Sequence, residues 1–175
     1  FNEVLARGGV VGGSSAGVLG RLLTETHDSL RPSDFGLLQQ KVKRATDMAF
    51  RLEQLTRQFF DTVSEFIAFQ REGQPVSNYS WQLRIVPSTR TLPGWDDVEI
   101  MWGHASETMG LLLKSLDELY KEMGSLYADG HDNLEDSMGN LGNVIRRMIE
   151  AEAAASGLIH KPSNEQIYWI EVNPR

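Results

Sequence analysis

The sequence contains no cysteine and only 6 prolines among its 175 residues. The absence of cysteine excludes disulfides, thiolate metal sites, iron–sulfur ligation and a cysteine nucleophile within the chain. Few prolines and 41% hydrophobic residues indicate a globular chain rather than a disordered one. No apolar run approaches the length of a membrane span, and no signal peptide is recognisable. A chain of this length can bury one good core, so we expect a single domain, residues 1–175.

Positive charge is scarce in the second half of the chain. The net charge is −7, and residues 1–90 carry 11 basic and 9 acidic side chains, whereas residues 91–175 carry 6 basic and 15 acidic ones. Because phosphate affinity comes from Lys and Arg, such an acidic chain is a poor general nucleic-acid binder. Any contact with DNA therefore requires a local basic surface.

One amphipathic stretch, residues 33–72, organises the chain. Its apolar positions recur every three and four residues, which is the repeat of a helix that packs along another helix. Ser33 is the expected N-cap, and Gly73 followed by Pro75 is the expected end. This first seam consists of Val42, Ala45, Ala49, Leu52, Thr56, Phe59, Val63, Phe66 and Gln70. In or beside the seam we expect four core aromatic side chains, Phe59, Phe60, Phe66 and Phe69.

Two further stretches carry the same repeat. Residues 95–127 form a second predicted helix, and residues 134–156 form a third that Gly157 closes. The second seam consists of Val98, Trp102, Ala105, Met109, Leu112, Leu116, Leu119, Met123 and Leu126, and the third of Leu134, Met138, Leu141, Ile145 and Met148. We interpret three glycines of the second helix as close approaches of another helix or as bends: Gly103, Gly110 and Gly124.

Two short segments change to the alternation of a strand, residues 80–86 and residues 166–172. We expect them to pair antiparallel and to close the base of the module. The second strand has apolar side chains on both faces, which predicts cover on both sides. The predicted fold is therefore mainly α: an antiparallel bundle of three long helices plus short N-terminal helices within residues 1–30, with a small two-stranded sheet.

The string Gly13-x-Ser15-x-Gly17 fits the nucleophile-elbow pattern of serine hydrolases. An elbow needs a central sheet, with a histidine and an acid supplied from later loops, and this chain has almost no sheet. A glycine-rich string is also the ordinary composition of a surface loop, which is the interpretation we favour. A hydrolase using Ser15 stays a remote alternative. His104 and Glu107 share a helical face, but their order differs from that of carboxylate-bridged metal bundles, so we predict no metal site.

The first half of the long helix carries a basic face beside its seam. Lys41, Arg44 and Arg51 share this face because they are three and seven residues apart. We favour a solvated surface with ion pairs such as Asp47–Arg51 over a surface that faces DNA. The candidates for DNA contact are Lys41, Lys43, Arg44, Arg51, Arg57, Arg84 and Arg90.

The final segment, Ile167-Tyr168-Trp169-Ile170-Glu171-Val172, resembles the return from the arch insertion of DinG-like, XPD-related superfamily 2 DNA helicases. The order of elements also matches: a long helix, a Trp-containing strand, and Pro-x-Trp-Asp-Asp-Val-Glu-x-x-Trp (residues 93–102) opening a Leu-rich helix. The likeness covers most of residues 33–175, and residues 1–30 match only as a variable helix-and-loop lead-in. In that family the arch is inserted within the first motor domain and forms one wall of a pore for single-stranded DNA.

The resemblance implies an accessory arch domain of an ATP-dependent helicase or helicase-nuclease, not catalytic alone. The parent would bind ATP and magnesium and act in DNA repair, whereas this chain carries no P-loop lysine, DEAH box or motor arginines and no cofactor site. Its partners would be the parent's motor domains and, weakly on its own, single-stranded DNA, in the cytoplasm. The alternative is a free-standing helical-bundle interaction or scaffold protein. The ends at Phe1 and Arg175 favour a piece of a larger protein.

Overall fold

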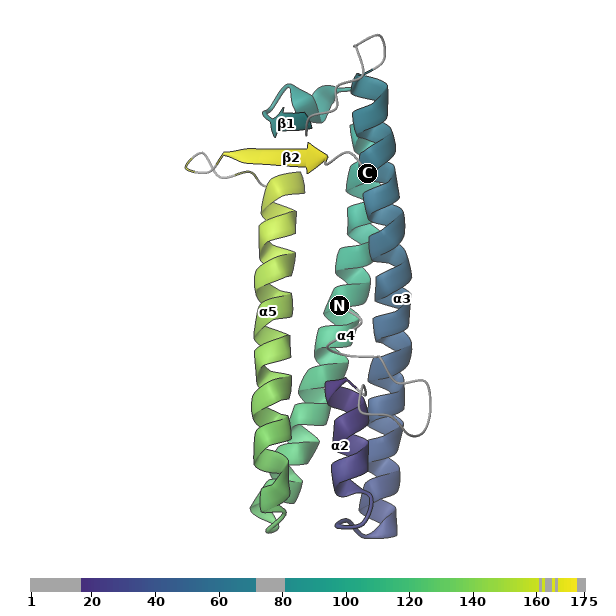
Figure 1. The fold of residues 1–175 in the computed structure, drawn as a ribbon, viewed down its shortest axis with the longest axis vertical. Coiled ribbons are helices and arrows are strands. Elements are labelled where there is room, and N and C mark those ends of the chain that lie inside the picture. Colours follow the sequence, from purple (N-terminus) through teal and green to yellow (C-terminus); the bar gives the residue numbers. More distant parts are fainter. Residues whose placement is uncertain (1–16, 72–80, 161, 163–164, 166, 173–175) are drawn as a thin grey trace. The chain divides into compact units, whose positions relative to one another are not determined.

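The computed structural model describes residues 17–71, 81–160, 162, 165 and 167–172. These residues are mostly helical, as predicted, with one small antiparallel sheet (Figure 1). The helices are α2 (Val18–Thr26), α3 (Pro32–Gln70), α4 (Trp95–Ala128) and α5 (Glu135–Ile159), the strands are β1 (Trp81–Ile85) and β2 (Tyr168–Val172), and two 3-10 turns are η1 (Thr89–Thr91) and η2 (Asp132–Leu134).

The chain divides into two compact units, which are described separately. Unit 1 comprises Phe1–Gln54 and Glu107–Ala151, and unit 2 comprises Leu55–Ser106 and Glu152–Arg175. Helices α3, α4 and α5 each contribute residues to both units. Because the heptad seams continue through both units with the same period, the sequence pattern contains no sign of this division.

Unit 1 is built on antiparallel helix pairs. Across α3 and α4, Lys41 pairs with Glu122 and Arg44 with Glu118, so rising numbers on one helix meet falling numbers on the other. Across α4 and α5, Gly124 faces the side chain of Met138. Helix α2 lies beside the first turns of α3, where the ring of His27 meets the edge of the Phe35 ring at 5.2 Å (Figure 1). The fully buried large side chains of this unit are Leu19, Leu22, Leu38, Leu52, Leu112, Leu116, Leu119, Met123, Leu134 and Leu141.

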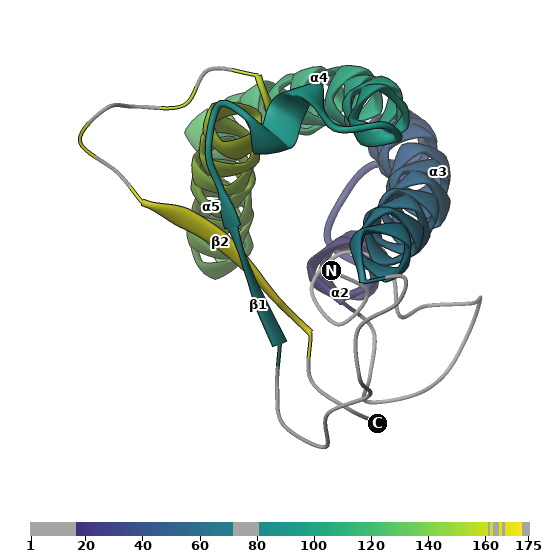
Figure 2. The same ribbon diagram turned by 90° about the horizontal axis from the view of Figure 1, so that it is seen from above.

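Unit 2 is built around two tryptophans of α4. Phe59 of α3 packs against Trp102 and Phe66 packs against Trp95, each at 5.3 Å between ring centroids. Trp95, in the first turn of α4, is 1% exposed. Strands β1 and β2 pair antiparallel from Trp81↔Val172 to Ile85↔Tyr168, and Figure 2 shows them side by side.

The predicted seams form the core. All nine positions of the second seam are buried, and the first seam is buried except for Thr56 and Gln70, which are half-buried. In the third seam Leu134, Leu141 and Met148 are buried, and the other two are half-buried. The predicted antiparallel pairing of the two strands is confirmed.

Two helix boundaries differ from the prediction. Helix α3 begins at Pro32, so Ser33 lies inside its first turn, where its hydroxyl donates to Asp34 at 3.1 Å. Proline suits the first helical position because its fixed φ is helical and its missing N–H would be unpaired there anyway. Helix α5 continues through Gly157 to Ile159. A Cβ at Gly157 would lie 3.6 Å from the hydroxyl of Tyr168, so the helix lies close to β2 here. The predicted stop of the first long helix, Gly73-x-Pro75, lies outside the described residues.

Three predictions of burial were wrong. Phe60 is 60% exposed and Phe69 is 57% exposed, because each lies on the helix surface turned away from the seam that buries Phe59 and Phe66. Strand β2 is covered on one side only, since Trp169 is 58% exposed.

Among the three glycines of α4 interpreted as close approaches or bends, Gly103 and Gly110 have open space where a Cβ would be, and only Gly124 lies near a neighbouring helix.

Candidate nucleic-acid interface

The basic residues at the start of α3 are tied to acidic residues of α4 within unit 1. The ammonium of Lys41 donates to Glu122 at 2.6 Å, and a guanidinium nitrogen of Arg44 lies 3.7 Å from a carboxylate oxygen of Glu118. The Lys41–Glu122 pair is partly buried, with side-chain exposures of 34% and 29%. These two cations hold neighbouring helices together, and their charge is compensated locally.

Further along α3 the predicted pair Asp47–Arg51 is replaced by another. Asp47 accepts a hydrogen bond from Lys43 at 2.8 Å, one helical turn towards the N-terminus. Arg51 is exposed and forms no ion pair with any residue that the structure describes. Arg57, on the same helix in unit 2, is exposed as well. Arg51, near the middle of α3, is therefore an exposed cation without an ion pair to a described residue, whereas Lys43 and Arg44, nearer the start of the helix, are exposed but lie beside acids.

The predicted candidate Arg90 is engaged inside unit 2. Its guanidinium donates to the carbonyl of Leu158 at 2.6 Å and lies 5.9 Å from the centre of the Trp95 ring. Leu158 belongs to the last turn of α5, whose carbonyls have no partner within the helix. Arg90 thus satisfies the end of α5, favourably placed at the negative end of the helix dipole, and its Nε is buried.

Arg84 lies on the one exposed face of the β1–β2 pair. Side chains alternate along both strands, so that cross-strand partners share a face. Ile85 is buried on the inner face with half-buried Leu83, Tyr168 and Ile170. The exposed face, which we name the outer sheet face, consists of Gln82, Arg84, Trp169 and Glu171.

The outer sheet face places an exposed indole beside a cation. Arg84 is the cross-strand partner of Trp169, and the amide of Gln82 donates to the carboxylate of its own partner, Glu171, at 3.4 Å. The sequence indicated the alternation and named Arg84, but it did not reveal that Trp169 is exposed. The only available signal was Glu171, whose charge on the same face as Trp169 argues against burial.

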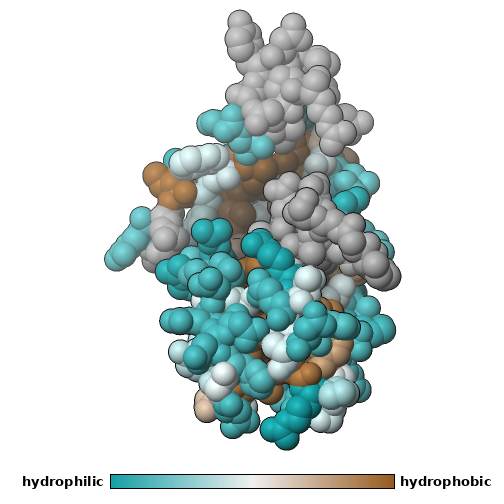
Figure 3. All heavy atoms as spheres, turned by 60° about the horizontal axis from the view of Figure 1, so that its bottom comes forward, coloured by the Kyte–Doolittle hydropathy of each residue, from teal (hydrophilic) through white to brown (hydrophobic). Residues whose placement is uncertain are grey.

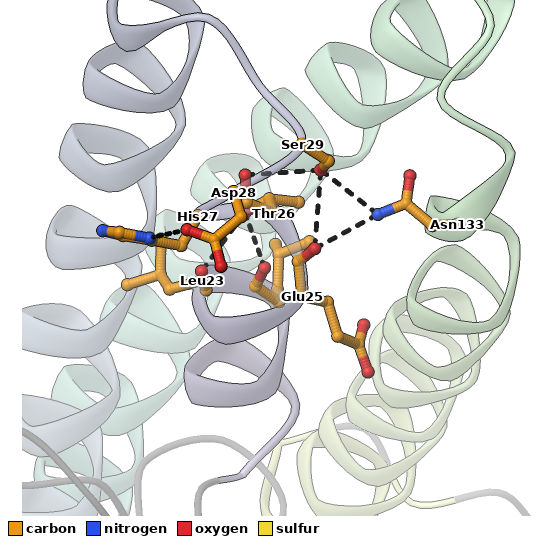
Figure 4. A network of polar contacts seen from close by, with 8 residues as sticks. Leu23, Glu25, Thr26, His27, Asp28, Ser29 and Asn133 are labelled. Carbon is orange, nitrogen blue, oxygen red and sulfur yellow. Dashed lines mark hydrogen bonds and ion pairs between the residues drawn. The ribbon is translucent and has the colours of Figure 1, made fainter.

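A second polar cluster, in unit 1, attaches α2 to the start of α5. The hydroxyl of Ser137 donates to the carboxylate of Glu25 at 2.5 Å. The amide of Asn133 donates to the backbone carbonyl of Glu25 at 3.2 Å and lies 3.4 Å from the hydroxyl of Ser29 (Figure 4). A small polar cleft beside it is lined by Val18, Arg21, Glu25, Asp136, Ser137 and Asn140. The polar groups of this cluster bond to one another, so we interpret it as a structural contact between α2 and the start of α5 rather than as a binding site.

Figure 3 shows one face of the molecule, on which hydrophilic side chains predominate in the lower part and hydrophobic ones are visible in isolated places. On the exposed surface of α4 an acid acts on a neighbouring cation one turn away. Asp117 raises the pKa of Lys121, first through a hydrogen bond of 2.7 Å and second through its charge. Basic side chains of unit 1 are thus repeatedly paired with acids.

The remaining candidate groups are separate from one another. Ser15 lies outside the described residues, and His27, which contacts Asp28 at 2.6 Å, is exposed at the end of α2. His104 and Glu107 are both exposed on α4. Within the part of the chain that the structure describes, no three potential metal ligands gather, and no helix is long and apolar enough to cross a membrane.

Comparison with known proteins assigns no family, because neither a family model nor a curated protein nor a solved structure matches the chain.

Proposed function

We propose that this chain is an accessory arch domain of an ATP-dependent DNA helicase, guiding single-stranded DNA past the motor. The observation that carries the proposal is the pairing of β1 with β2. The chain leaves this sheet at Ile85, passes through α4 and α5, and returns to the same sheet at Tyr168. A helical excursion inserted into another domain needs its two connections close together, and this sheet provides them.

The exposure and the pairing of the candidate cations indicate which part of the surface would face DNA. Arg51 and Arg84 are exposed and form no ion pair with a described residue, whereas Lys41, Lys43 and Arg44 pair with acids and Arg90 donates to a backbone carbonyl. We therefore assign the DNA-facing role to the middle of α3 and to the outer sheet face. With a net charge of −7 the chain alone would bind single strands weakly, and the motor domains would hold the other side of the strand.

The catalytic groups would belong to the parent protein, which would bind ATP and magnesium in its motor domains and work in the cytoplasm. The chain's own sequence has none of the groups that cradle a triphosphate. The alternative is a free-standing helical scaffold: the three seams are largely buried within this chain, but large apolar side chains such as Phe50, Phe60 and Leu111 are exposed.

The test uses the protein expressed from the complete reading frame. Its ATP hydrolysis should be stimulated by single-stranded DNA, and it should unwind a duplex that has a single-stranded tail. Replacing residues 33–172, which hold the long helices and the sheet of the proposed arch, by a short Gly–Ser linker should preserve the ATP hydrolysis, which reports on a folded motor, and should abolish or strongly reduce unwinding. A complete protein without DNA-stimulated hydrolysis, or unwinding that survives the deletion, would overturn the proposal.

A further inference from the structure

We propose that the outer sheet face is a nucleotide-binding platform for single-stranded DNA, on which Trp169 stacks against an unpaired base and Arg84 holds the adjacent phosphate. This rests on the proposed function and specifies where one nucleotide of the guided strand binds. The supporting observations are the 58% exposure of the Trp169 side chain and the placement of Arg84 directly opposite it in the antiparallel ladder.

The ladder fixes the distance between the two groups. Directly opposed residues of an antiparallel pair have Cβ atoms about 4.5–5.5 Å apart, so a long arginine side chain reaches past the edge of its partner's ring. Both side chains leave the same face, because the opposite face packs Ile85 and Tyr168 inward. Such an arrangement leaves the flat indole open to a base while the guanidinium reaches the backbone that carries the base.

Glu171 and Gln82, the polar neighbours of Trp169 on the outer sheet face, can form hydrogen bonds with a base stacked on the indole. Glu171, one pleat beyond Trp169, carries a carboxylate that repels phosphate, but Gln82 already donates to it at 3.4 Å. A carboxylate beside a stacked base can accept from an exocyclic amino group, as acidic side chains do from cytosine. The face therefore separates a place for a base, near Glu171 and Trp169, from a place for a phosphate, at Arg84.

The size of the face decides between a nucleotide and a protein partner. Two strands of five residues form a ribbon about 17 Å long and about 10 Å wide, or roughly 170 Å². A stable protein interface buries about 800 Å² on each partner. Tryptophan and arginine are also favoured at protein interfaces, but this face alone is far too small for one. It has room for one or two bases.

The experiment records NMR spectra of the 175-residue chain during titration with oligodeoxycytidylate, whose bases carry the amino group that the Glu171 carboxylate can accept from. The indole N–H signal of Trp169, assigned by its loss in Trp169→Phe, should shift. Trp169→Ala should weaken binding about 5- to 150-fold, the range corresponding to one stacked base, and Trp169→Phe should retain most of the affinity. Arg84→Gln should reduce the slope of log affinity against log salt by about 0.7. Phe69→Ala removes an equally exposed aromatic ring of the same unit and should leave affinity unchanged.

Three results would overturn the inference, each with a different consequence. Oligonucleotide binding that shifts signals of α3 and leaves Trp169 unmoved would refute the platform but not the arch. A titration that shifts no signal of the chain would refute the platform as well, while the ATP hydrolysis of the complete protein decides the proposed function independently. Unchanged DNA affinity in Trp169→Ala, together with lost self-association or lost docking to the motor domains, would make the face a protein interface. Backbone spectra of each variant establish that it is folded.

Discussion

Gly110 is an exposed residue in the interior of α4 where glycine has no evident packing role. Nothing lies within 4 Å of the position that its Cβ would take. Gly110→Ala should therefore stabilise the chain by up to about 1 kcal/mol, because alanine loses less conformational entropy in a helix. Urea unfolding followed by circular dichroism measures this change.

Gly130 is the matched control in the same unit. Its φ of +100° lies in the left-handed region, so Gly130→Ala should destabilise the chain by about 1–2 kcal/mol although its Cβ also meets open space. Equal effects of the two substitutions would show that available space, rather than backbone conformation, controls these positions.

The pKa of Lys121 provides a test of pH dependence. The hydrogen bond that Lys121 donates to the Asp117 carboxylate raises this pKa above its ordinary value in the folded chain. A raised pKa stabilises the folded state below the unfolded pKa, and this contribution disappears as the pH rises through the folded pKa. In Asp117→Asn the lysine should titrate at lower pH, which NMR of its ε-methylene carbon detects. Because the pair is exposed, high salt should reduce the shift, and a shift independent of salt would contradict this origin.

At the scale of elements, α4 and α5 are joined in unit 2 by a partly buried series of hydrogen bonds. The indole of Trp102 donates to the hydroxyl of Ser156 at 2.9 Å, and both Ser156 and Ser106 donate to Glu152, at 2.7 and 2.8 Å. One carboxylate oxygen thus accepts from both helices. This shared acceptor fixes the register between α4 and α5, which apolar seams alone specify less strictly.

Glu152→Ala should destabilise the chain by about 1–3 kcal/mol, because two partly buried hydroxyls lose their acceptor. Glu152→Gln should cost less, since an amide oxygen still accepts. Denaturation followed by tryptophan fluorescence and circular dichroism gives both values, and the exposed Glu150→Ala on the same helix is the control. A Glu152→Ala variant as stable as the control would show that these hydrogen bonds do not fix the register between α4 and α5.

The elements themselves could be predicted because their evidence is periodic. Seam positions such as Leu112 and Leu119 repeat at the helical spacing, and each is fully buried. The wrong predictions of burial concern residues that lie beside the periodic seam positions. Phe60 follows Phe59 by one residue, a rotation of about 100° on a helix, and hydrophobicity alone does not tell which of the two faces the core. The predicted cover of Trp169 was wrong for a related reason. Alternation along a strand distinguishes its two faces but does not tell which of them another element covers.

The candidate site was less predictable than the fold, because a cation's partner can be remote in sequence. Lys41 and Glu122 are 81 residues apart, and only the packing of α3 on α4 brings them together. The same holds for Arg90, whose acceptor is a backbone carbonyl of α5 and leaves no trace in side-chain patterns. Charge clustering therefore located the cations of the helix but could not tell which of them lie beside acids, as Lys41 does.

At the scale of the whole molecule, net negative charge dominates any encounter with DNA. The excess of acids resides mainly in residues 91–175, which include the acids that neutralise Lys41 and Arg44. Affinity for a strand then depends on a few open cations, and each contributes separately to the salt dependence. This makes the salt slope a more specific measure than affinity itself.

Arg51 provides the last test, carried out in the complete protein because the motor is proposed to hold the other side of the strand. Arg51→Gln should reduce the slope of log affinity for single strands against log salt by about 0.7, one phosphate contact, and should weaken binding at low salt. Folding stability should change by less than about 0.5 kcal/mol, since the side chain is exposed and forms no ion pair with the described residues. Lys43→Gln is the matched control, because Asp47 already compensates its charge, and it should change the slope less. Equal slopes for both variants and the parent protein would remove the middle of α3 from the DNA path and leave its cations as a solvated surface.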